Sequence, residues 1–278
     1  MIKDIVLHLS TRASEDATID YAVSVGRAFE AHLTGVAFAL EPFVPPSLGI
    51  GDVVPPDWLD EERAQAQAAA TGAISRFGET ARRNGLAFES RLLESSLAGA
   101  GELFAEVAAR FDLSVMRQAE PGKAPLEELV IEGALFDSGR PVLVVPYIHK
   151  APLALGRVLV CWNGSPNAAR AVGDAMPFLR RAKVVEVVIV LGESGSSDEI
   201  PGADIGGHLA RHGFDVEVER LTAIKGDVTD TILSHAADVE ADLIVMGGYG
   251  HSRLREFILG GVTRGILRTM TVPVLMSH

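Results

Sequence analysis

The sequence predicts an α/β protein made of two tandem domains, each a doubly wound parallel sheet. Short apolar runs alternate with helical patterns along the chain, which is typical of βαβ units and of a parallel sheet covered on both faces. The plan occurs twice, because residues 158–162 repeat the run at 5–9 and residues 236–246 repeat residues 106–116. Repeats this far apart indicate duplicated domains rather than solenoid units.

The two closing strands predict where the domains divide. Each copy ends on an apolar run that contains proline, at residues 140–146 and 271–276, and the segment 147–156 then reads as the linker. We expect one domain over residues 1–147 and a second over residues 156–278. Apolar strands left at a sheet edge favour association, so we expect the closing strands to meet and the halves to pack about a pseudo-twofold axis.

The elements of the first copy follow in order from its apolar patterns. They are a strand at 5–9, a helix at 18–29, a helix at 61–83, a strand that ends at Met116, and the closing strand. Residues 41–58 carry five prolines and two glycines and predict a long loop. This loop is either an exposed connection or a lid or partner contact, since its apolar side chains are costly to leave in water.

The second copy begins with a strand at 158–162 and a helix at 168–179, and further apolar strands follow at 187–191 and 242–246. Parallel sheets of this kind bind ligands at the carboxyl ends of their strands, near a topological switch point. The segment that follows Met246 is therefore the expected place for a ligand.

Charge and composition narrow the classes of function. The apolar fraction of 47% suffices for packed cores, and the formal net charge is −12. No basic run interrupts this acidity, which argues against a nucleic-acid partner. No apolar run reaches the ~18 residues of a membrane helix, and the first residues read as a strand rather than a signal peptide. We expect a soluble cytoplasmic protein with no membrane partner.

Cys161 is the single cysteine. It has no partner for an internal disulfide, and no Cys/His cluster has the spacing of a zinc site. Because Cys161 lies in an apolar run, we interpret it as a buried structural thiol, with a reactive thiol as the alternative.

The most informative pattern is a group of glycines after the strand at 242–246. Gly247 and Gly250 are followed, after nine intervening residues, by Gly260 and Gly261. Glycines in such numbers remove Cβ atoms where something must approach the backbone closely. A strand that leads through a glycine loop into a helix offers free N–H groups and the positive end of a helix dipole, which suit a phosphate.

This pattern resembles the nucleotide motif of the universal stress proteins. Residues 158–165 resemble the first strand and turn of that family, residues 224–227 its glycine-containing turn, and the terminal strand its last strand. The resemblance covers the whole chain as a tandem pair, strongly over residues 156–278 and weakly over the first copy. It implies a Rossmann-like, adenine nucleotide alpha hydrolase-like fold in each half.

The resemblance also implies a ligand, ATP or a related adenine nucleotide with or without Mg²⁺. It places the nucleotide against the following residues of the second copy: Asn163, Val190, Gly247, Gly250, Ser252, Gly260, Gly261, Val262 and Thr263. Asn163 would face the nucleoside end, and Val190 would contact the base through its backbone. Ser252 either binds phosphate or caps a helix, and Arg264 is one of four arginines that are either solvated or phosphate partners.

Two positions depart from the family pattern. Asn163 stands where the family usually has Asp, and Gly261 where it usually has Ser or Thr, although Thr263 supplies a hydroxyl two positions on. Asparagine keeps a hydrogen-bond acceptor but loses the charge. These departures weaken the case for metal assistance more than the case for nucleotide binding.

The first copy lacks the glycine pattern. After Met116 come Ala119, Glu120 and Pro121, and proline has no N–H to donate. Three further glutamates would repel phosphate, at positions 127, 128 and 132. We therefore expect a structural copy whose nucleotide site is degenerate.

These residues favour a nucleotide-binding protein over an enzyme. The resemblance implies a stress-response role in which nucleotide occupancy alters conformation or partner choice. The alternative is a slow ATPase or another nucleotide-hydrolysing enzyme of the same superfamily, and a third reading is a scaffold with an empty site. Phosphoryl transfer needs positioned charge and a group that orients the attacking water, and the sequence supports no catalytic residue. The sequence does not identify a protein partner, and it leaves open whether two chains form a homodimer.

Overall fold

A computed structural model describes residues 1–12, 17–43, 56–123, 125–191, 203–223, 227–248 and 261–278. The elements of the first half are β1 (Asp4–His8), α1 (Ala17–Phe29), β2 (His32–Leu40), α2 (Pro56–Arg83), β3 (Phe88–Ser95), α3 (Ala100–Ala108), β4 (Leu113–Arg117), α4 (Leu126–Asp137) and β5 (Val142–Val145). Those of the second half are β6 (Arg157–Cys161), α5 (Pro166–Leu179), β7 (Val184–Leu191), α6 (Ala203–Arg211), β8 (Val216–Thr222), α7 (Val228–Asp238), β9 (Leu243–Gly247), α8 (Gly261–Thr269) and β10 (Val274–Ser277).

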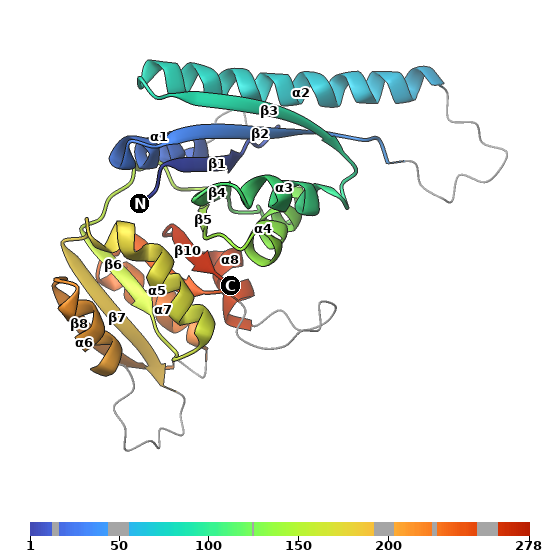
Figure 1. Cartoon of the computed structure of the whole chain (residues 1–278). Coiled ribbons are helices and arrows are strands. Elements are labelled where there is room, and N and C mark those ends of the chain that lie inside the picture. Colours follow the sequence, from blue (N-terminus) through green and yellow to red (C-terminus); the bar gives the residue numbers. More distant parts are fainter. Residues whose placement is uncertain (13–16, 44–55, 124, 192–202, 224–226, 249–260) are drawn as a thin grey trace.

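The ten strands form a single sheet in the order β3-β2-β1-β4-β5-β10-β9-β6-β7-β8. Each half has the same internal order, read outward from β5 or β10, and every pairing within a half is parallel. The first strand of each half lies in the middle, with its successors on either side, so both halves are doubly wound (Figure 1). The α/β fold class expected from the sequence is confirmed.

The two half-sheets are joined by one antiparallel ladder between β5 and β10. Val144 lies opposite Val274, and Val142 opposite Met276. These are the two closing strands, and all their residues are buried. Their pairing confirms the expectation that the halves meet through these strands. The antiparallel direction of the two strands is the one that a twofold axis between the halves would give.

Two apolar cores cover the two faces of the sheet. One is built with α1, α2, α5 and α6, and the other with α3, α4, α7 and α8. Each core takes residues from both halves, and Phe29 of α1 meets Phe178 of α5 edge to face, with ring centroids 4.9 Å apart. The connection between β5 and β6 is held to α1, because the hydroxyl of Ser24 accepts a hydrogen bond from the N–H of Leu153 (2.7 Å). The halves therefore share their hydrophobic cores.

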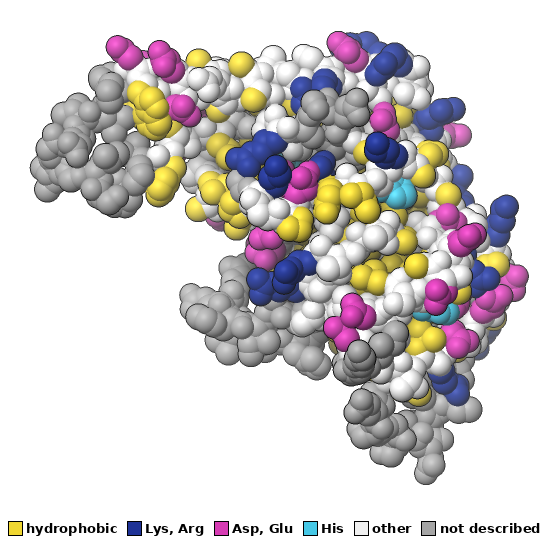
Figure 2. Space-filling model, turned by 180° about the vertical axis from the view of Figure 1, so that it is seen from behind, with side chains coloured by type: hydrophobic (Ala, Val, Ile, Leu, Met, Phe, Trp, Pro, Cys, Tyr) yellow, Lys and Arg dark blue, Asp and Glu magenta, His cyan; other side chains and the backbone are white. Residues whose placement is uncertain are grey.

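Burial explains the character of the strands. The central strands β4, β5, β9 and β10 are buried on both faces and are almost continuously apolar, as parallel sheets covered by helices require. The outer strands β3 and β8 are mostly exposed and carry charged residues, which protect a sheet edge from unwanted pairing. On the face shown in Figure 2, basic side chains are interspersed with acidic ones rather than gathered into a continuous stripe.

The structure corrects one boundary near the proline-rich segment. Residues 44–55 lie outside the described residues, but α2 begins at Pro56, so that Trp58 belongs to a helix and not to the expected loop. Proline is favoured in the first turn of a helix because its missing N–H would have no partner there. Trp58 is 39% exposed and Phe43 78% exposed.

Helices α3 and α4 cross where two glycines meet. A Cβ on Gly101 would lie 2.5 Å from the carbonyl oxygen of Leu129, and a Cβ on Gly133 would overlap the carbonyl of Gly101. The close crossing therefore requires glycine at both positions.

We expect Gly133→Ala to lower the free energy of unfolding by about 1–3 kcal/mol, the usual range for overpacking. Gly173→Ala in α5 is the matched control, because nothing lies within 4 Å of its added Cβ and alanine is a better helix former by up to ~1 kcal/mol. Denaturant unfolding of both variants measures the difference. Equal stabilities for the two variants would contradict the close crossing.

Candidate functional site

Three strand ends of the second half meet at one edge of the sheet. Cys161 of β6 pairs with Met246 of β9 on one side and with Val188 of β7 on the other. Gly247 follows Met246 directly, and Asn163 and Val190 lie two residues beyond Cys161 and Val188. The structure therefore brings the three predicted positions to the same edge. From β6 the chain builds outward through β7 and β8, and it then returns to the other side of β6 to form β9 and β10. The gap between β6 and β9 is therefore the topological switch point, where such sheets bind ligands.

Asn163 shapes the turn that leads into α5. Its Oδ1 accepts a hydrogen bond from the N–H of Ser165 (3.1 Å), and Gly164 between them has a φ of 72°, which favours glycine. The hydroxyl of Ser165 in turn accepts from the N–H of Ala168 (3.1 Å) and caps the helix. This turn places the exposed Asn163 and the N-terminus of α5 at the switch point.

Gly247 and Gly248 have packing reasons to be glycine. A Cβ on Gly247 would lie 2.6 Å from the backbone nitrogen of Ala168, so α5 packs directly on the end of β9. A Cβ on Gly248 would lie 2.9 Å from the side chain of Leu135 in the first half. Gly247 therefore serves close packing of backbone on backbone, whatever else it does for a ligand.

Helix α8 begins at the other end of the glycine segment. An added Cβ on Gly261, its first residue, would have no atom of the described residues within 4 Å, so these residues leave room for a side chain there. Val262 packs on the core, and Thr263 is only 4% exposed, which directs it into the protein. The first turn of α8 holds no acidic residue. Gly250, Ser252 and Gly260, also predicted for the site, lie outside the described residues.

The first half differs at the equivalent place. Helix α4 corresponds to α8, but its first turn carries Glu127 and Glu128. The hydroxyl of Ser10, just after β1, donates a hydrogen bond to Oε1 of Glu127 (3.2 Å). A carboxylate of the protein itself therefore lies at the helix N-terminus, where an anion would otherwise be favoured. Sequence reasoning noted the glutamate but missed this contact, because no local pattern joins residues 117 positions apart.

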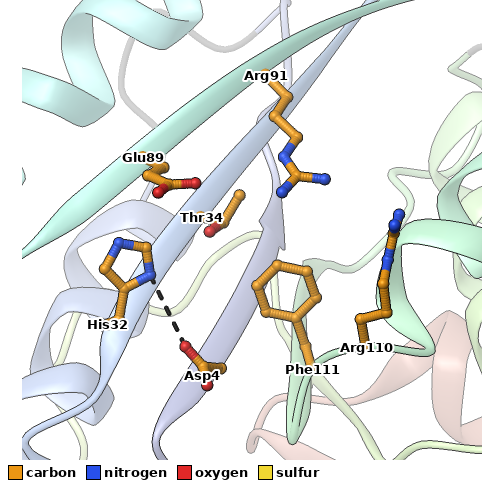
Figure 3. Close-up of a pocket in the computed structure, with 7 residues that line it drawn as sticks. All are labelled: Asp4, His32, Thr34, Glu89, Arg91, Arg110 and Phe111. Carbon is orange, nitrogen blue, oxygen red and sulfur yellow. Dashed lines mark ion pairs between the residues drawn. The ribbon is translucent and has the colours of Figure 1, made fainter.

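A hollow lies at the amino ends of the strands in the first half, at the edge of the half-sheet opposite to its strands' carboxyl ends. It has a volume of about 450 Å³ and is lined by Asp4, His32, Thr34, Glu89, Arg91, Arg110 and Phe111 (Figure 3). Nδ1 of His32 lies 3.9 Å from a carboxylate oxygen of Asp4. Arg110 follows the C-terminus of α3, where a cation offsets the negative end of the helix dipole.

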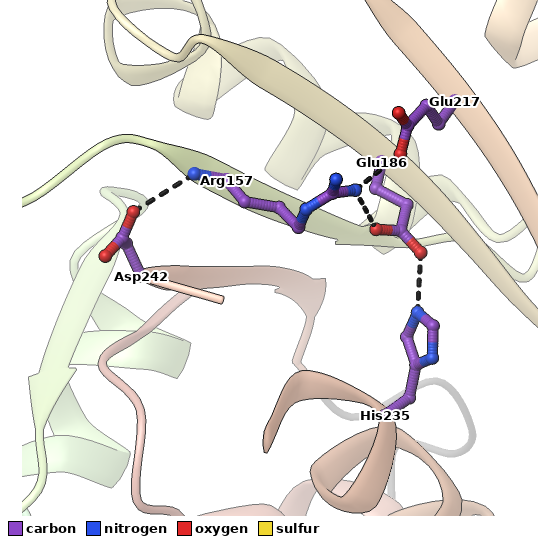
Figure 4. Close-up of polar contacts among 5 residues, drawn as sticks. All are labelled: Arg157, Glu186, Glu217, His235 and Asp242. Atoms are coloured by element: carbon purple, nitrogen blue, oxygen red, sulfur yellow. Dashed lines mark hydrogen bonds and ion pairs between the residues drawn. The ribbon is translucent and has the colours of Figure 1, made fainter. Parts of the chain in front are cut away.

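The second half fills the equivalent place with an ionic network. Nη1 of Arg157 lies 2.5 Å from a carboxylate oxygen of Glu186 and 2.5 Å from one of Glu217, and Nε2 of His235 lies 2.5 Å from the other oxygen of Glu186 (Figure 4). The hydrogen bonds that the guanidinium of Arg157 donates to Glu217 and to Glu186 raise the pKa of Arg157. Glu186 of β7 pairs with Glu217 of β8. The corresponding pair in the first half is Thr34 of β2 with Glu89 of β3, and both of these residues line the hollow. The network satisfies its own charges, which indicates a structural role.

The described part of the chain contains neither a candidate metal-binding cluster nor a candidate membrane-spanning helix. Within it, no three His, Cys, Asp or Glu side chains are grouped so that they could hold a metal ion. Among the helices that the structure describes, none combines the length and the apolar character needed to span a membrane.

The strand order defines a class of protein, that of doubly wound α/β proteins, and glycines follow the strand beside the switch point in the sequence. Residues 155–278 match the sequence model of the Universal stress protein family. The second half of the chain is therefore similar to this family.

Individual relatives agree with this assignment. Universal stress protein Slr1230 of Synechocystis is 29% identical over 139 residues, which cover 49% of this chain and 46% of the relative. The chain thus spans about half the length of that curated relative. A universal stress protein of Archaeoglobus fulgidus shares the fold over 99% of this chain and 97% of its own, with 18% identity and a TM-score of 0.71.

One universal stress protein, solved in complex with cAMP, is 19% identical and covers 54% of this chain and 99% of its own, with a TM-score of 0.36.

Cys161 lies beside this edge as the last residue of β6, and burial raises its pKa to about 12. At pH 8 a thiol with so high a pKa is almost entirely protonated, whereas about a quarter of a free cysteine is thiolate. Because the thiolate is the nucleophile, Cys161 is poorly suited to act as one.

We expect Cys161 in the folded protein to react with a thiol reagent at about pH 8 at least about 100-fold more slowly than in the denatured protein. Stopped-flow absorbance with a chromogenic disulfide measures both rates, with Cys161→Ser as the blank. Comparable rates in the two states would show an activated thiol instead.

Proposed function

We propose that the second half binds ATP or a related adenine nucleotide and that the protein acts in a stress response as a cytoplasmic binding protein, not as a catalyst. The observation that carries the proposal is the position of the glycine segment. It starts at the carboxyl end of β9, beside the switch point, and ends at the first turn of α8. Backbone N–H groups and the positive end of α8 then suit phosphate.

The other predicted positions support the same placement. Asn163 follows the end of β6, the strand next to β9, and Val190 lies near the end of β7, the strand beyond β6. A nucleoside at the switch point would lie against both. The first turn of α8 carries no carboxylate to oppose an anion. Mg²⁺ would have to be held mainly by the phosphates, since Asn163 brings no charge.

The first half is proposed to bind no nucleotide. Pro121 and Glu120 replace the glycines in its loop, and the contact of Glu127 with Ser10 places an internal carboxylate at the N-terminus of α4. Binding of a phosphate there would bring two anions together without an added cation.

We expect isothermal titration with ATP to give one site per chain, because only the second copy keeps the glycine segment. Gly250→Val should weaken binding by about 2 kcal/mol, roughly 30-fold, since phosphate oxygens and backbone N–H groups would lose their partners. Ala119→Val is the matched control in the loop of the first half and should leave the affinity unchanged. Two equivalent sites per chain would refute the degenerate first half, and unchanged affinity in Gly250→Val would refute the site.

We expect phosphate release from bound ATP to be slower than about one turnover per minute, well below the ~1–10³ per second of typical enzymes. A glycine-lined cradle binds the ground state, and uniform binding does not accelerate the chemical step. A steady-state phosphate assay with Mg²⁺ measures the rate, with Gly250→Val as the control for contaminating activity. Turnover near one per second that disappears in this variant would favour the ATPase alternative.

A further inference from the structure

The hollow at the amino ends of β1, β2 and β3 is open because the first half lacks the ionic network of the second. In strand register, Thr34 takes the position of Glu186. The carboxylate of Glu186 joins Arg157 to His235, and the side chain of Thr34 is too short to make such a link. Ala105 of α3 stands where α7 has His235, counted back from the aspartate that precedes β4 or β9. Smaller side chains at both positions leave a volume of about 450 Å³, which is within the range of small-molecule sites.

Two arginines of the hollow stand where the second half carries glutamates. Arg91 of β3 takes the register position of Glu219 of β8. Arg110, which follows α3, takes the position of Glu240, which follows α7. The same corner is therefore acidic in the second half and basic in the first. Within the described residues, neither guanidinium makes a hydrogen bond or an ion pair, so the donors of both are available to another molecule.

The opposite side of the hollow is acidic. Figure 3 shows the two guanidinium groups on one side and the carboxylates of Asp4 and Glu89 on the other. Asp4 has the ring of His32 beside it, and the carboxylate of Glu89 makes no hydrogen bond or ion pair with any residue that the structure describes. Positive and negative charges are thus separated across the hollow instead of being paired with each other.

The floor between the two charged sides is formed by buried side chains. Thr34 is 1% exposed and Phe111 is 8% exposed, and both line the hollow. In Figure 3, Thr34 lies between Glu89 and Arg91. Its hydroxyl can donate or accept a hydrogen bond, and the ring of Phe111 offers an apolar contact. The hollow therefore combines two opposite charges with a floor that suits a short chain joining them.

We propose that this hollow binds a small molecule that carries an anionic group at one end and an amine at the other. Arg91 and Arg110 bind the anion, a carboxylate or a phosphate, because the planar fork of a guanidinium fits both. Asp4 and Glu89 bind the ammonium group. A ligand with only one of the two charges would meet a like charge across the hollow, so the separation of charges selects for a molecule with both.

This hollow is separate from the proposed nucleotide site. It lies in the first half, at the amino ends of the strands, whereas the switch point of the second half lies at the carboxyl ends. The two sites can therefore be tested separately.

The first test titrates the full chain with small zwitterions and follows its backbone amides by NMR. The ω-amino carboxylates from glycine to ε-aminocaproate vary the distance between the two charges, and O-phosphoethanolamine presents a phosphate as the anionic group. We expect at least one of these probes to shift the amide signals of Glu89, Arg91 and Arg110, with a dissociation constant below about 10 mM, as expected for ligands of so few atoms.

Analogues that lack one charge are the matched controls. The alkanoate, the alkylamine and ethyl phosphate should bind at least about 10-fold more weakly, because each loses the charge-assisted hydrogen bonds at one side. Equal affinity for an alkanoate or for ethyl phosphate would overturn the proposal in favour of a plain anion site. The absence of shifts with every probe would overturn it outright.

Variants then assign the two sides of the hollow. Arg91→Gln, Arg110→Gln and Glu89→Gln each remove one charge and should weaken binding of the best probe at least about 5-fold. Arg63→Gln is the matched control, because Arg63 is exposed on α2, which covers the other face of the sheet. This variant should bind the probe like the unmodified protein. Equal binding in all four variants would show that the probe binds elsewhere.

Titration with ATP distinguishes the hollow from an additional phosphate contact of the nucleotide. Arg91→Gln and Arg110→Gln should leave the affinity for ATP unchanged, and saturation with the best probe should leave it unchanged as well. Loss of ATP binding in both variants would show that the arginines hold the nucleotide, and the assignment of the hollow to a separate zwitterion would then be wrong.

Discussion

The architecture depends on the antiparallel ladder between β5 and β10. Every other strand pairing in the sheet is parallel and lies within one half. Without this ladder, each half would expose a fully buried, apolar closing strand at a sheet edge, which is a strong stimulus to association. With it, the exposed edges are β3 and β8, whose charged residues tolerate water. The shared cores and the contacts at the glycine segment both follow from this one junction.

The parts of the fold that could be predicted from sequence are those with a strong local period. The buried strands are apolar runs, and the duplication is visible because residues 236–246 copy residues 106–116. At atomic detail the copies share one device: Asp112 accepts hydrogen bonds from the N–H groups of Lys3 and Asp4, as Asp242 does from Gly156 and Arg157 (Figure 4). Strands β3 and β8 gave no such signal, because an exposed edge strand has a mixed polar pattern.

The site was predictable only in outline. That Asn163, Val190 and Gly247 share an edge follows from their places at or just beyond the carboxyl ends of strands. The structure shows it through the register of β6, β7 and β9. What Gly247 packs against could not be predicted, because the atom that excludes a Cβ belongs to Ala168, far away in the sequence. The same holds for Leu135 beside Gly248 and for Ser10 beside Glu127, since neither pair leaves a periodic trace.

The covalent connection through residues 146–156 has a consequence for how such a protein diverges. Two separate subunits meet only as often as their concentration allows, whereas a short tether gives its two ends an effective concentration on the order of millimolar. In a symmetric pair of identical subunits, each substitution appears twice, and a change that fills one site with a carboxylate fills both. Within one chain the copies vary independently, so Glu127 could come to occupy one half while Gly261 stays open in the other.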